Sequence, residues 1–163
     1  MKLFIRILLF VLLINISSAY AAVKTTICSG DWNSASTWSP SGVPTATDEV
    51  VIKGSHAPTI NSGNIQCSSI TIQQGARIVL NAGQKMSVAS TGGITIEGTL
   101  SIEQGAIDIL LPGTSFIISS TGKVTWNPAN NTLAGASLFT NCIEHFAPTS
   151  TLIIKKWYDT KVG

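Results

Sequence analysis

A short motif recurs along the chain from residue 50 onward, in which two apolar residues flank a central residue that is usually polar and a glycine or polar turn follows. Alternation of this kind over β-branched residues indicates short β-strands whose first and third side chains share one face. Glycine permits the positive φ values that tight corners need. The motifs begin, in order, at Val50, Ile70, Ile78, Met86, Ile94, Leu100, Ile107, Phe116 and Val124.

The spacing of these motifs predicts how the strands are arranged. From residue 70 onward the starts lie 6–9 residues apart, and every third start repeats after 21–24 residues. This period predicts an all-β chain folded as a right-handed parallel β-helix, a solenoid with three short strands per coil. A β-sandwich is the alternative fold for regular short strands. The two-residue Asn-Gly type of turn that hairpins favour is absent between these strands, which favours the solenoid.

The same register predicts which side chains form the interior. One internal column should stack Ile70, Ile94 and Phe116, and a second should stack Ile78, Leu100 and Val124. Neighbouring coils of such a stack lie about 4.8 Å apart and are hydrogen-bonded along it. Because a single coil cannot bury its apolar side alone, the stack has to be continuous and closed at its ends.

Residues 1–21 have the pattern of a signal peptide. Lys2 and Arg6 give a positive start, an apolar run follows, and Ala19-Tyr20-Ala21 has the small-x-small form of a cleavage site. The run is shorter than the roughly 20 apolar residues of a membrane span, although a retained N-terminal anchor helix is the alternative. We therefore expect secretion, or display at the cell surface, after cleavage near Ala21, with no transmembrane segment in the mature chain.

Charge argues against nucleic acid as a partner. Removal of residues 1–21 takes away Lys2 and Arg6, so 10 Lys and Arg become 8, which balance 8 Asp and Glu. Nucleic-acid-binding proteins need a basic surface that displaces counterions from phosphates.

Residues 22–49 differ from the repeats in composition and are expected to cap the open apolar end of residues 50–163, the β-helix. Two tryptophans there could each bury roughly 200 Å² over that end, or could instead offer aromatic platforms to sugar rings. An aspartate before the first strand can hold a turn by accepting hydrogen bonds from backbone amides. The candidate stacking or capping residues are Trp32 and Trp38, and the structural residues of the cap are Gly30, Pro44 and Asp48.

The order of these residues resembles a known family. Gly30-Asp31-Trp32, Thr37-Trp38, Gly42-Val43-Pro44 and Asp48-Glu49-Val50-Val51-Ile52 are similar to the first segment of the eight-glycine domain. Similar segments open β-helical regions of bacterial secreted and surface proteins, so the resemblance implies an extracellular all-β domain, often attached to adhesins or glycan-related proteins. It implies no catalytic mechanism. The sequence departs from the family at Gly54-Ser55-His56, where the family often has adjacent Gly and His.

The repeats lack the usual arrangements of catalytic groups. Glycoside hydrolysis needs two carboxylates about 5–9.5 Å apart, and the outward strand centres offer no such pair. His56 and His145 are expected to be solvated loop residues, since no Gly-x-Ser-x-Gly motif accompanies them. We therefore assign no catalytic, cofactor-binding or metal-binding residues and expect no enzyme.

Cysteine pairing and the C-terminal part of the chain each leave two alternatives open. Cys28, Cys67 and Cys142 leave at least one thiol without an intramolecular partner, and a Cys28–Cys67 disulfide and buried thiols are both consistent with the sequence. Residues 127–151 break the repeat, and Leu152-Ile153-Ile154 resumes it. Either Trp157 and Tyr158 close the solenoid, or the chain is the first part of a longer protein with further domains, which is the expectation we favour.

Taken together, these patterns predict a secreted or cell-surface β-solenoid module with a structural or adhesive role, whose partner is an extracellular glycan or a cell-surface component. The alternative is a non-catalytic fragment of, or an accessory domain to, a polysaccharide-active enzyme.

Overall fold

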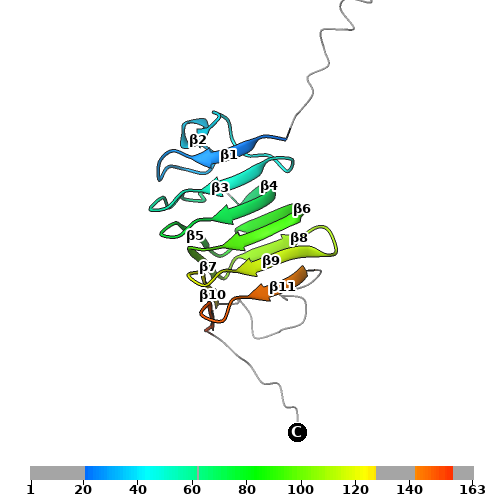
Figure 1. Cartoon of the computed structure of the whole chain (residues 1–163). Coiled ribbons are helices and arrows are strands. Elements are labelled where there is room, and N and C mark those ends of the chain that lie inside the picture. The colour runs from blue at the N-terminus through cyan, green and yellow to red at the C-terminus, as the bar shows by residue number, and fades with distance from the viewer. Residues whose placement is uncertain (1–20, 62, 128–141, 156–163) are drawn as a thin grey trace, which may run out of the picture.

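The computed structural model describes residues 21–61, 63–127 and 142–155, and these form a β-solenoid of about 5 turns with mostly parallel strands (Figure 1). The predicted parallel solenoid is thereby confirmed. A single 3-10 turn, η1 (Ala35–Thr37), interrupts the strands near the N-terminal end. The strands are β1 (Val23–Thr26), β2 (Trp38–Ser39), β3 (Glu49–Ile52), β4 (Asn64–Ile72), β5 (Arg77–Leu80), β6 (Lys85–Ile96), β7 (Thr99–Glu103), β8 (Ala106–Ile109), β9 (Thr114–Ile118), β10 (Lys123–Asn127), β11 (Cys142–Phe146) and β12 (Thr151–Ile154).

The strands stack into three faces, which we number. Face 1 contains β1, β3, the second halves of β4 and β6, β9 and β11. Face 2 contains β5, β7, β10 and β12. Face 3 contains the first halves of β4 and β6 together with β8. The strands β4 and β6 each pass from face 3 to face 1, and the register of their pairing shifts between Cys67 and Ser69, where β4 turns the corner.

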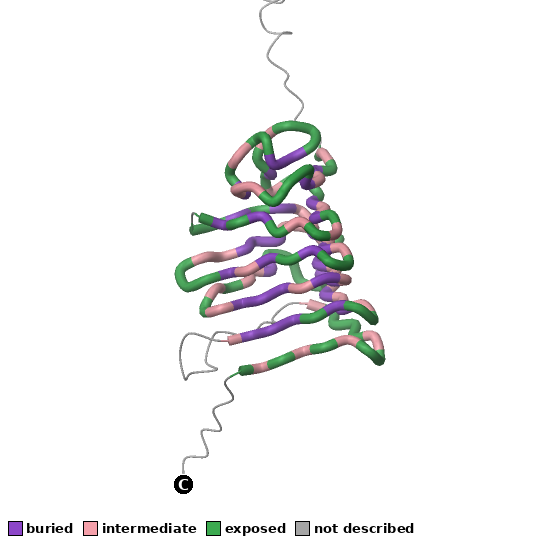
Figure 2. Tube along the Cα trace, turned by 90° about the vertical axis from the view of Figure 1, so that its left-hand side faces the viewer, coloured by how far each residue is buried: buried purple, intermediate pink, exposed green. Residues whose placement is uncertain are grey.

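The predicted internal columns are the observed ones. On face 1, Ile70 pairs with Ile94 and Ile94 with Phe116, and on face 2, Ile78 pairs with Leu100 and Leu100 with Val124. All six side chains are at most 1% exposed, and buried positions alternate with others along β1, β3, β5 and β9 (Figure 2). Burying an aliphatic side chain of this size stabilises the fold by about 1.5–3 kcal/mol, so these columns are the main source of stability.

The inward column of face 1 carries a charged residue at each end. Lys24 of β1 is in register with Val50, and its ammonium donates to the carbonyl oxygens of Pro40 and Ser41, at 3.1 Å each. Glu144 of β11 is in register with Phe116 and is exposed at the other end of the stack. At the N-terminal end, the ammonium of Lys24 ends the apolar column with its hydrogen bonds satisfied by the cap.

Three strands, β1, β2 and β11, and the first half of β4 were not foreseen from the sequence. The strand β1 extends face 1 into the segment expected to be only a cap, and β2 pairs with it antiparallel. The first half of β4 uses Ile65 and Cys67 as its inward pair. The strand β11 lies inside the region where the repeat breaks, whereas β12 is the resumed repeat. Trp157 and Tyr158 lie outside the described residues.

No helix in the described part of the chain is long and apolar enough to cross a membrane.

Candidate functional site

The two tryptophans proposed as a cap or a sugar platform lie inside the core. Trp32 and Trp38 are each 1% exposed, and their rings meet edge to face with centroids 4.8 Å apart. The indole Nε1–H of Trp38 donates to the carbonyl oxygen of Trp32 at 2.8 Å. A sugar stacks on an exposed aromatic face, and neither ring offers one in this structure. Their burial at the N-terminal end of the stack is the arrangement that the capping interpretation requires.

Gly30 is held at a close approach. A Cβ atom at this position would lie 2.4 Å from Thr37 Oγ1, which donates a 2.7 Å hydrogen bond to the carbonyl oxygen of Asp31. Any larger residue would displace Thr37 and with it the chain between the two tryptophans. The packing of the cap therefore requires a glycine at position 30, independently of any ligand.

Asp48 ties the cap to the first strands. It is 5% exposed, and its carboxylate accepts hydrogen bonds from the amides of Ala22, at 3.0 Å, and Thr45, at 2.8 Å. Burial disfavours its ionised form, but these hydrogen bonds outweigh burial and hold the pKa of Asp48 below its ordinary value. Pro44, just before Thr45, is buried as well.

Acidic and nucleophilic side chains are dispersed over the described residues. No group of three or more His, Cys, Asp or Glu side chains there is placed to hold a metal ion. Asp108 forms an ion pair with Lys85 at 3.1 Å, and Glu103 with Lys155 at 2.5 Å. None of the three cysteines forms a disulfide with a described residue, and Cys28 is exposed whereas Cys67 is buried.

His56 links two coils. Its Nδ1 lies 2.9 Å from Thr26 Oγ1, which also accepts the backbone amide of Lys53 at 3.0 Å. Because the hydroxyl oxygen is already an acceptor, its hydrogen can be donated to Nδ1 of the neutral ring. His56 is half-buried in this contact, whereas His145 is exposed.

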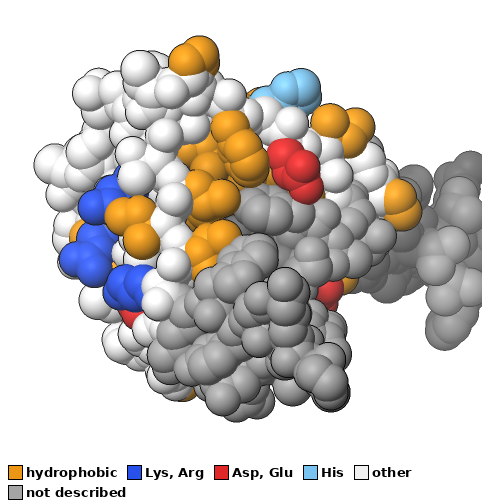
Figure 3. All heavy atoms as spheres, turned by 90° about the horizontal axis from the view of Figure 1, so that it is seen from below, with side chains coloured by type: hydrophobic (Ala, Val, Ile, Leu, Met, Phe, Trp, Pro, Cys, Tyr) orange, Lys and Arg blue, Asp and Glu red, His pale blue; other side chains and the backbone are white. Residues whose placement is uncertain are grey.

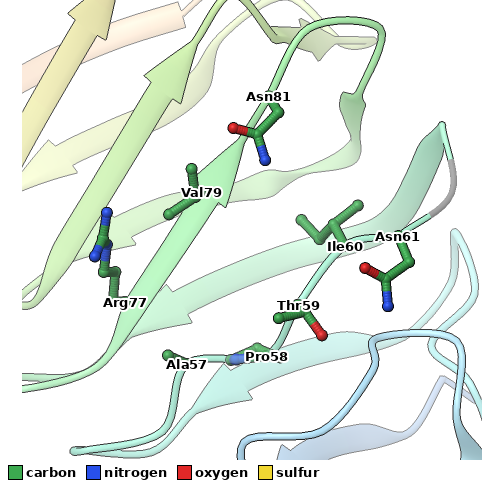
Figure 4. Close-up of a pocket in the computed structure, with 8 residues that line it drawn as sticks. All are labelled: Ala57, Pro58, Thr59, Ile60, Asn61, Arg77, Val79 and Asn81. Carbon is green, nitrogen blue, oxygen red and sulfur yellow. The ribbon is translucent and has the colours of Figure 1, made fainter.

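A hollow of about 290 Å³ lies between the segment 57–61 and β5, at the N-terminal end of face 2 (Figure 4). This size is near the lower limit of small-molecule sites. Its lining residues are Ala57, Pro58, Thr59, Ile60, Asn61, Arg77, Val79 and Asn81. Pro58 and Ile60 are buried, whereas the polar side chains of the set are exposed, so the hollow combines an apolar base with a polar rim.

The hollow exists because the segment 57–61 bonds to the cap and not to β5. The amide of Thr59 donates to Gly30 O at 2.9 Å, and the carbonyl of Thr59 accepts from Trp32 N at 2.8 Å. Pro58 has no N–H to offer to a neighbouring strand. Among the described residues, the hydrogen bonds that join this part of the chain to the next coil flank the hollow: Arg77 N donates to His56 O at 3.0 Å, and Gln84 Nε2 donates to Ile60 O.

One residue of β5 turns unpaired backbone groups toward this hollow. Thr99 N donates to Ala76 O, so the even-numbered residues of β5 bond to β7 and the odd-numbered ones point toward the segment 57–61. The amide of Arg77 is used by His56, and the amide of Asn81 donates to Gln84 Oε1 at 2.6 Å. Val79 therefore keeps an amide and a carbonyl without a partner among the described residues, and such groups need water or a ligand.

Amide side chains add further hydrogen-bonding capacity. Asn61 Nδ2 donates to Asp31 Oδ2 at 2.7 Å, which fixes the side chain and leaves its Oδ1 as an acceptor. The side chain of Asn81 forms no hydrogen bond with the described residues, so it offers a donor and an acceptor together. In Figure 4 the guanidinium of Arg77 points away from Ala57 and Pro58, so its charge lies at the rim of the hollow.

Sequence reasoning missed this site. The segment 57–61 contains a buried pair, Pro58 and Ile60, that resembles one more repeat, and the proline is the signal that this repeat is not paired with its neighbour. Neither Asn61 nor Asn81 belongs to a recognisable motif. Each is an exposed residue that directly follows a buried one, Ile60 or Leu80.

Comparisons with known proteins give a family and no function. No curated protein and no solved structure matches the chain. Nothing links it to the eight-glycine domain, so that resemblance stays a prediction. A family model matches residues 23–153, which begin at the first residue of β1 and end inside β12. Because the match spans well over half of the sequence and the whole described ladder, the chain belongs to the family described as a domain of unknown function (DUF8693).

Proposed function

We propose that this protein is a secreted or cell-surface β-solenoid module with a structural and adhesive role, which contacts glycans through the hollow on face 2 and carries out no catalysis. The observation that carries the proposal is the hollow itself. An apolar base with amide side chains and an unpaired peptide group around it suits a sugar, which presents C–H groups on its ring faces and hydroxyl groups at its edges.

The continuous stack supports the structural part of the proposal. Hydrogen-bonded pairing runs without a break from β1 through β3, β4, β6 and β9 to β11, so every coil is fixed by its neighbours. Such a stack is a rigid spacer that holds a binding site at a defined position.

Secretion rests on the sequence of residues 1–21. The full chain, expressed in a bacterial host with a secretory pathway, should appear outside the cytoplasm with an N-terminus near Ala22. Intact-mass measurement of the exported protein checks the cleavage point. An uncut chain that remains in the cytoplasm would contradict this part of the proposal.

A glycan array tests the binding role. The full chain after processing should bind a subset of glycans, and Asn81→Ala should weaken that binding because the variant removes a donor and an acceptor from the rim of the hollow. Asn64→Ala is the matched control, since Asn64 is an exposed asparagine at the start of β4 on face 3. An equal loss of glycan binding in both variants, or no glycan binding by a folded protein, would contradict the glycan-binding role. Release of reducing ends from polysaccharides by the same preparation would favour the enzyme alternative.

A further inference from the structure

Cations on face 2 continue from the rim of the hollow down the solenoid. Arg77 of β5 pairs in register with Thr99 of β7, and Thr99 pairs with Lys123 of β10. The two cations therefore lie two strand spacings apart, roughly 9–10 Å, with a hydroxyl residue between them. Figure 3, which views the lower end of the stack, shows Lys and Arg side chains gathered along one side of the molecule.

Neither cation is neutralised by a carboxylate in the described residues. The ion pairs there join Lys85 to Asp108 and Lys155 to Glu103. Arg77 acts on Glu103 only at a distance, as one of the weaker causes that lower the pKa of that carboxyl. Since the chain without residues 1–21 has balanced charges, the free positive charge beside the hollow is a local property of face 2.

Small residues make room beside this pair of cations. Ser101 and Thr125 occupy the next outward positions along β7 and β10, and each is only 7% exposed. They are ladder partners of one another, so short side chains lie beside the longer Arg77 and Lys123 on this face.

A negative charge at the end of the hollow opposite Arg77 determines how an acidic ligand would be oriented. Asp31 holds Asn61 there, and hydrogen bonds from the amide of Asn33 and from Asn61 keep its pKa below the ordinary value, so it is anionic at neutral pH. An acidic group of a ligand is therefore repelled at the Asn61 end and attracted at the Arg77 end.

We propose that face 2 binds an acidic oligosaccharide, with one sugar ring in the hollow and the carboxylate of a uronic acid residue between Arg77 and Lys123. The proposal rests on the glycan-binding function proposed above and names its ligand class. The ring in the hollow bonds to Asn81, to Asn61 Oδ1 and to the peptide groups of Val79. The carboxylate lies over Thr99, where the planar guanidinium of Arg77 can bind it with two parallel hydrogen bonds.

An extended peptide fits this site less well. A peptide strand that pairs with β5 needs successive free amides and carbonyls along the edge. Here the amides of Arg77 and Asn81 already donate to His56 O and to Gln84 Oε1, so only Val79 is open on both groups. A compact ligand with a few hydroxyl groups uses one open peptide position, whereas a strand would need several.

The test compares uronic acid oligosaccharides with their carboxyl-reduced forms, which keep the sugar rings and lose the charge. The processed full-length protein is titrated with each member of several such pairs, and amide chemical shifts are followed by NMR. The acidic member should bind at least several-fold more tightly, with shifts at Val79 and Asn81. Arg77→Gln and Lys123→Gln should each reduce the affinity for the acidic member on the order of tenfold. Lys123 does not line the hollow, so Lys123→Gln should leave the affinity for the reduced member unchanged. Lys85→Gln, a loss of charge on face 3, should change neither.

The outcomes separate this inference from the proposed function. Equal binding of charged and reduced sugars at the hollow would overturn the acidic ligand and leave the glycan role standing. Binding by no sugar of either kind would overturn both. Shifts that appear on face 3, or tighter binding of an unstructured peptide at Val79, would overturn the assignment of this site to an acidic glycan.

Discussion

Replacement of Ile94 by alanine tests whether the internal columns hold this fold together. The side chain is fully buried, with Ile70 on one side in the ladder and Phe116 on the other. The change removes three carbon atoms, and about 0.8 kcal/mol for each gives a transfer loss of about 2.4 kcal/mol. A cavity between two well-packed neighbours adds to this, so we expect a total loss of about 3–4 kcal/mol of unfolding free energy.

Thr95→Ala is the matched control, because Thr95 is the next residue of the same strand and points outward. A change on the outer face should cost no more than about 1 kcal/mol. Leu152→Ala probes the end of the stack. Leu152 is half-buried and has Val124 as a ladder partner on one side, so its loss should be clearly smaller than that of Ile94.

Urea unfolding followed by circular dichroism and tryptophan fluorescence measures these differences. With a slope of about 1–3 kcal/mol per molar urea, Ile94→Ala should lower the midpoint by roughly 1–4 M. The two probes also show whether the coils unfold together, which repeat proteins do not always do. If Thr95→Ala matched Ile94→Ala, or if Leu152→Ala were the more damaging change, the assignment of inward columns would be wrong.

Four further outcomes follow from local contacts. Asp48 has a lowered pKa in the folded chain, so its ionised carboxylate stabilises the fold at a pH above its ordinary pKa. This stabilisation is lost as the pH falls through the pKa of the folded chain. The difference in urea midpoint between the protein and Asp48→Asn should therefore shrink on acidification below about pH 4. Burial raises the pKa of the Cys67 thiol to about 12, so an alkylating reagent at pH 8 should modify exposed Cys28 well before Cys67, as read by mass spectrometry. Gly122→Ala would place a Cβ 2.1 Å from Ile96 O, so it should lower the thermal midpoint by several degrees. Gly83→Ala would meet no atom within 4 Å, although Gly83 has a φ of 78°, so it should lower the thermal midpoint less. Trp38→Phe removes the donor to Trp32 O and should cost about 0.5–1.5 kcal/mol beyond the lost packing, measured by the same urea assay.

The sequence predicts the middle of this solenoid well because the same physical rule applies on every coil. If one coil takes 21–24 residues, the period places Ile70, Ile94 and Phe116 at equivalent positions of successive coils. The pairing of β4, β6 and β9 has this register. Inward positions of the central strands are mostly apolar, since an unpaired polar group there would be buried without a partner. Thr114 is a buried polar exception, and its hydroxyl donates to Leu111 O at 2.7 Å.

The same rule fails at the ends of the stack, where the coils have one neighbour each. Lys24 and Glu144 occupy inward positions of β1 and β11, so neither strand shows the apolar alternation that identifies the others. Lys24 is tolerated because carbonyls of the cap receive its ammonium, and Glu144 because its position is exposed. The periodicity of apolar residues could not reveal these strands. Their inward charged residues are tolerated because of their surroundings at the ends of the described stack, which lie outside the repeat pattern.

The hollow has its origin in the same cap. The chain around Gly30 and Trp32 closes the apolar core by bonding to both backbone groups of Thr59, and this draws the segment 57–61 toward the cap. Pro58 cannot bond to β5 in return, so the ladder of face 2 starts at β5, two coils after β1 opens that of face 1, and leaves Val79 open. A solenoid of uniform coils would present a closed ladder here, without a recess. The candidate binding site is thus a consequence of how the core is capped, which explains why it lies where the repeat is least regular.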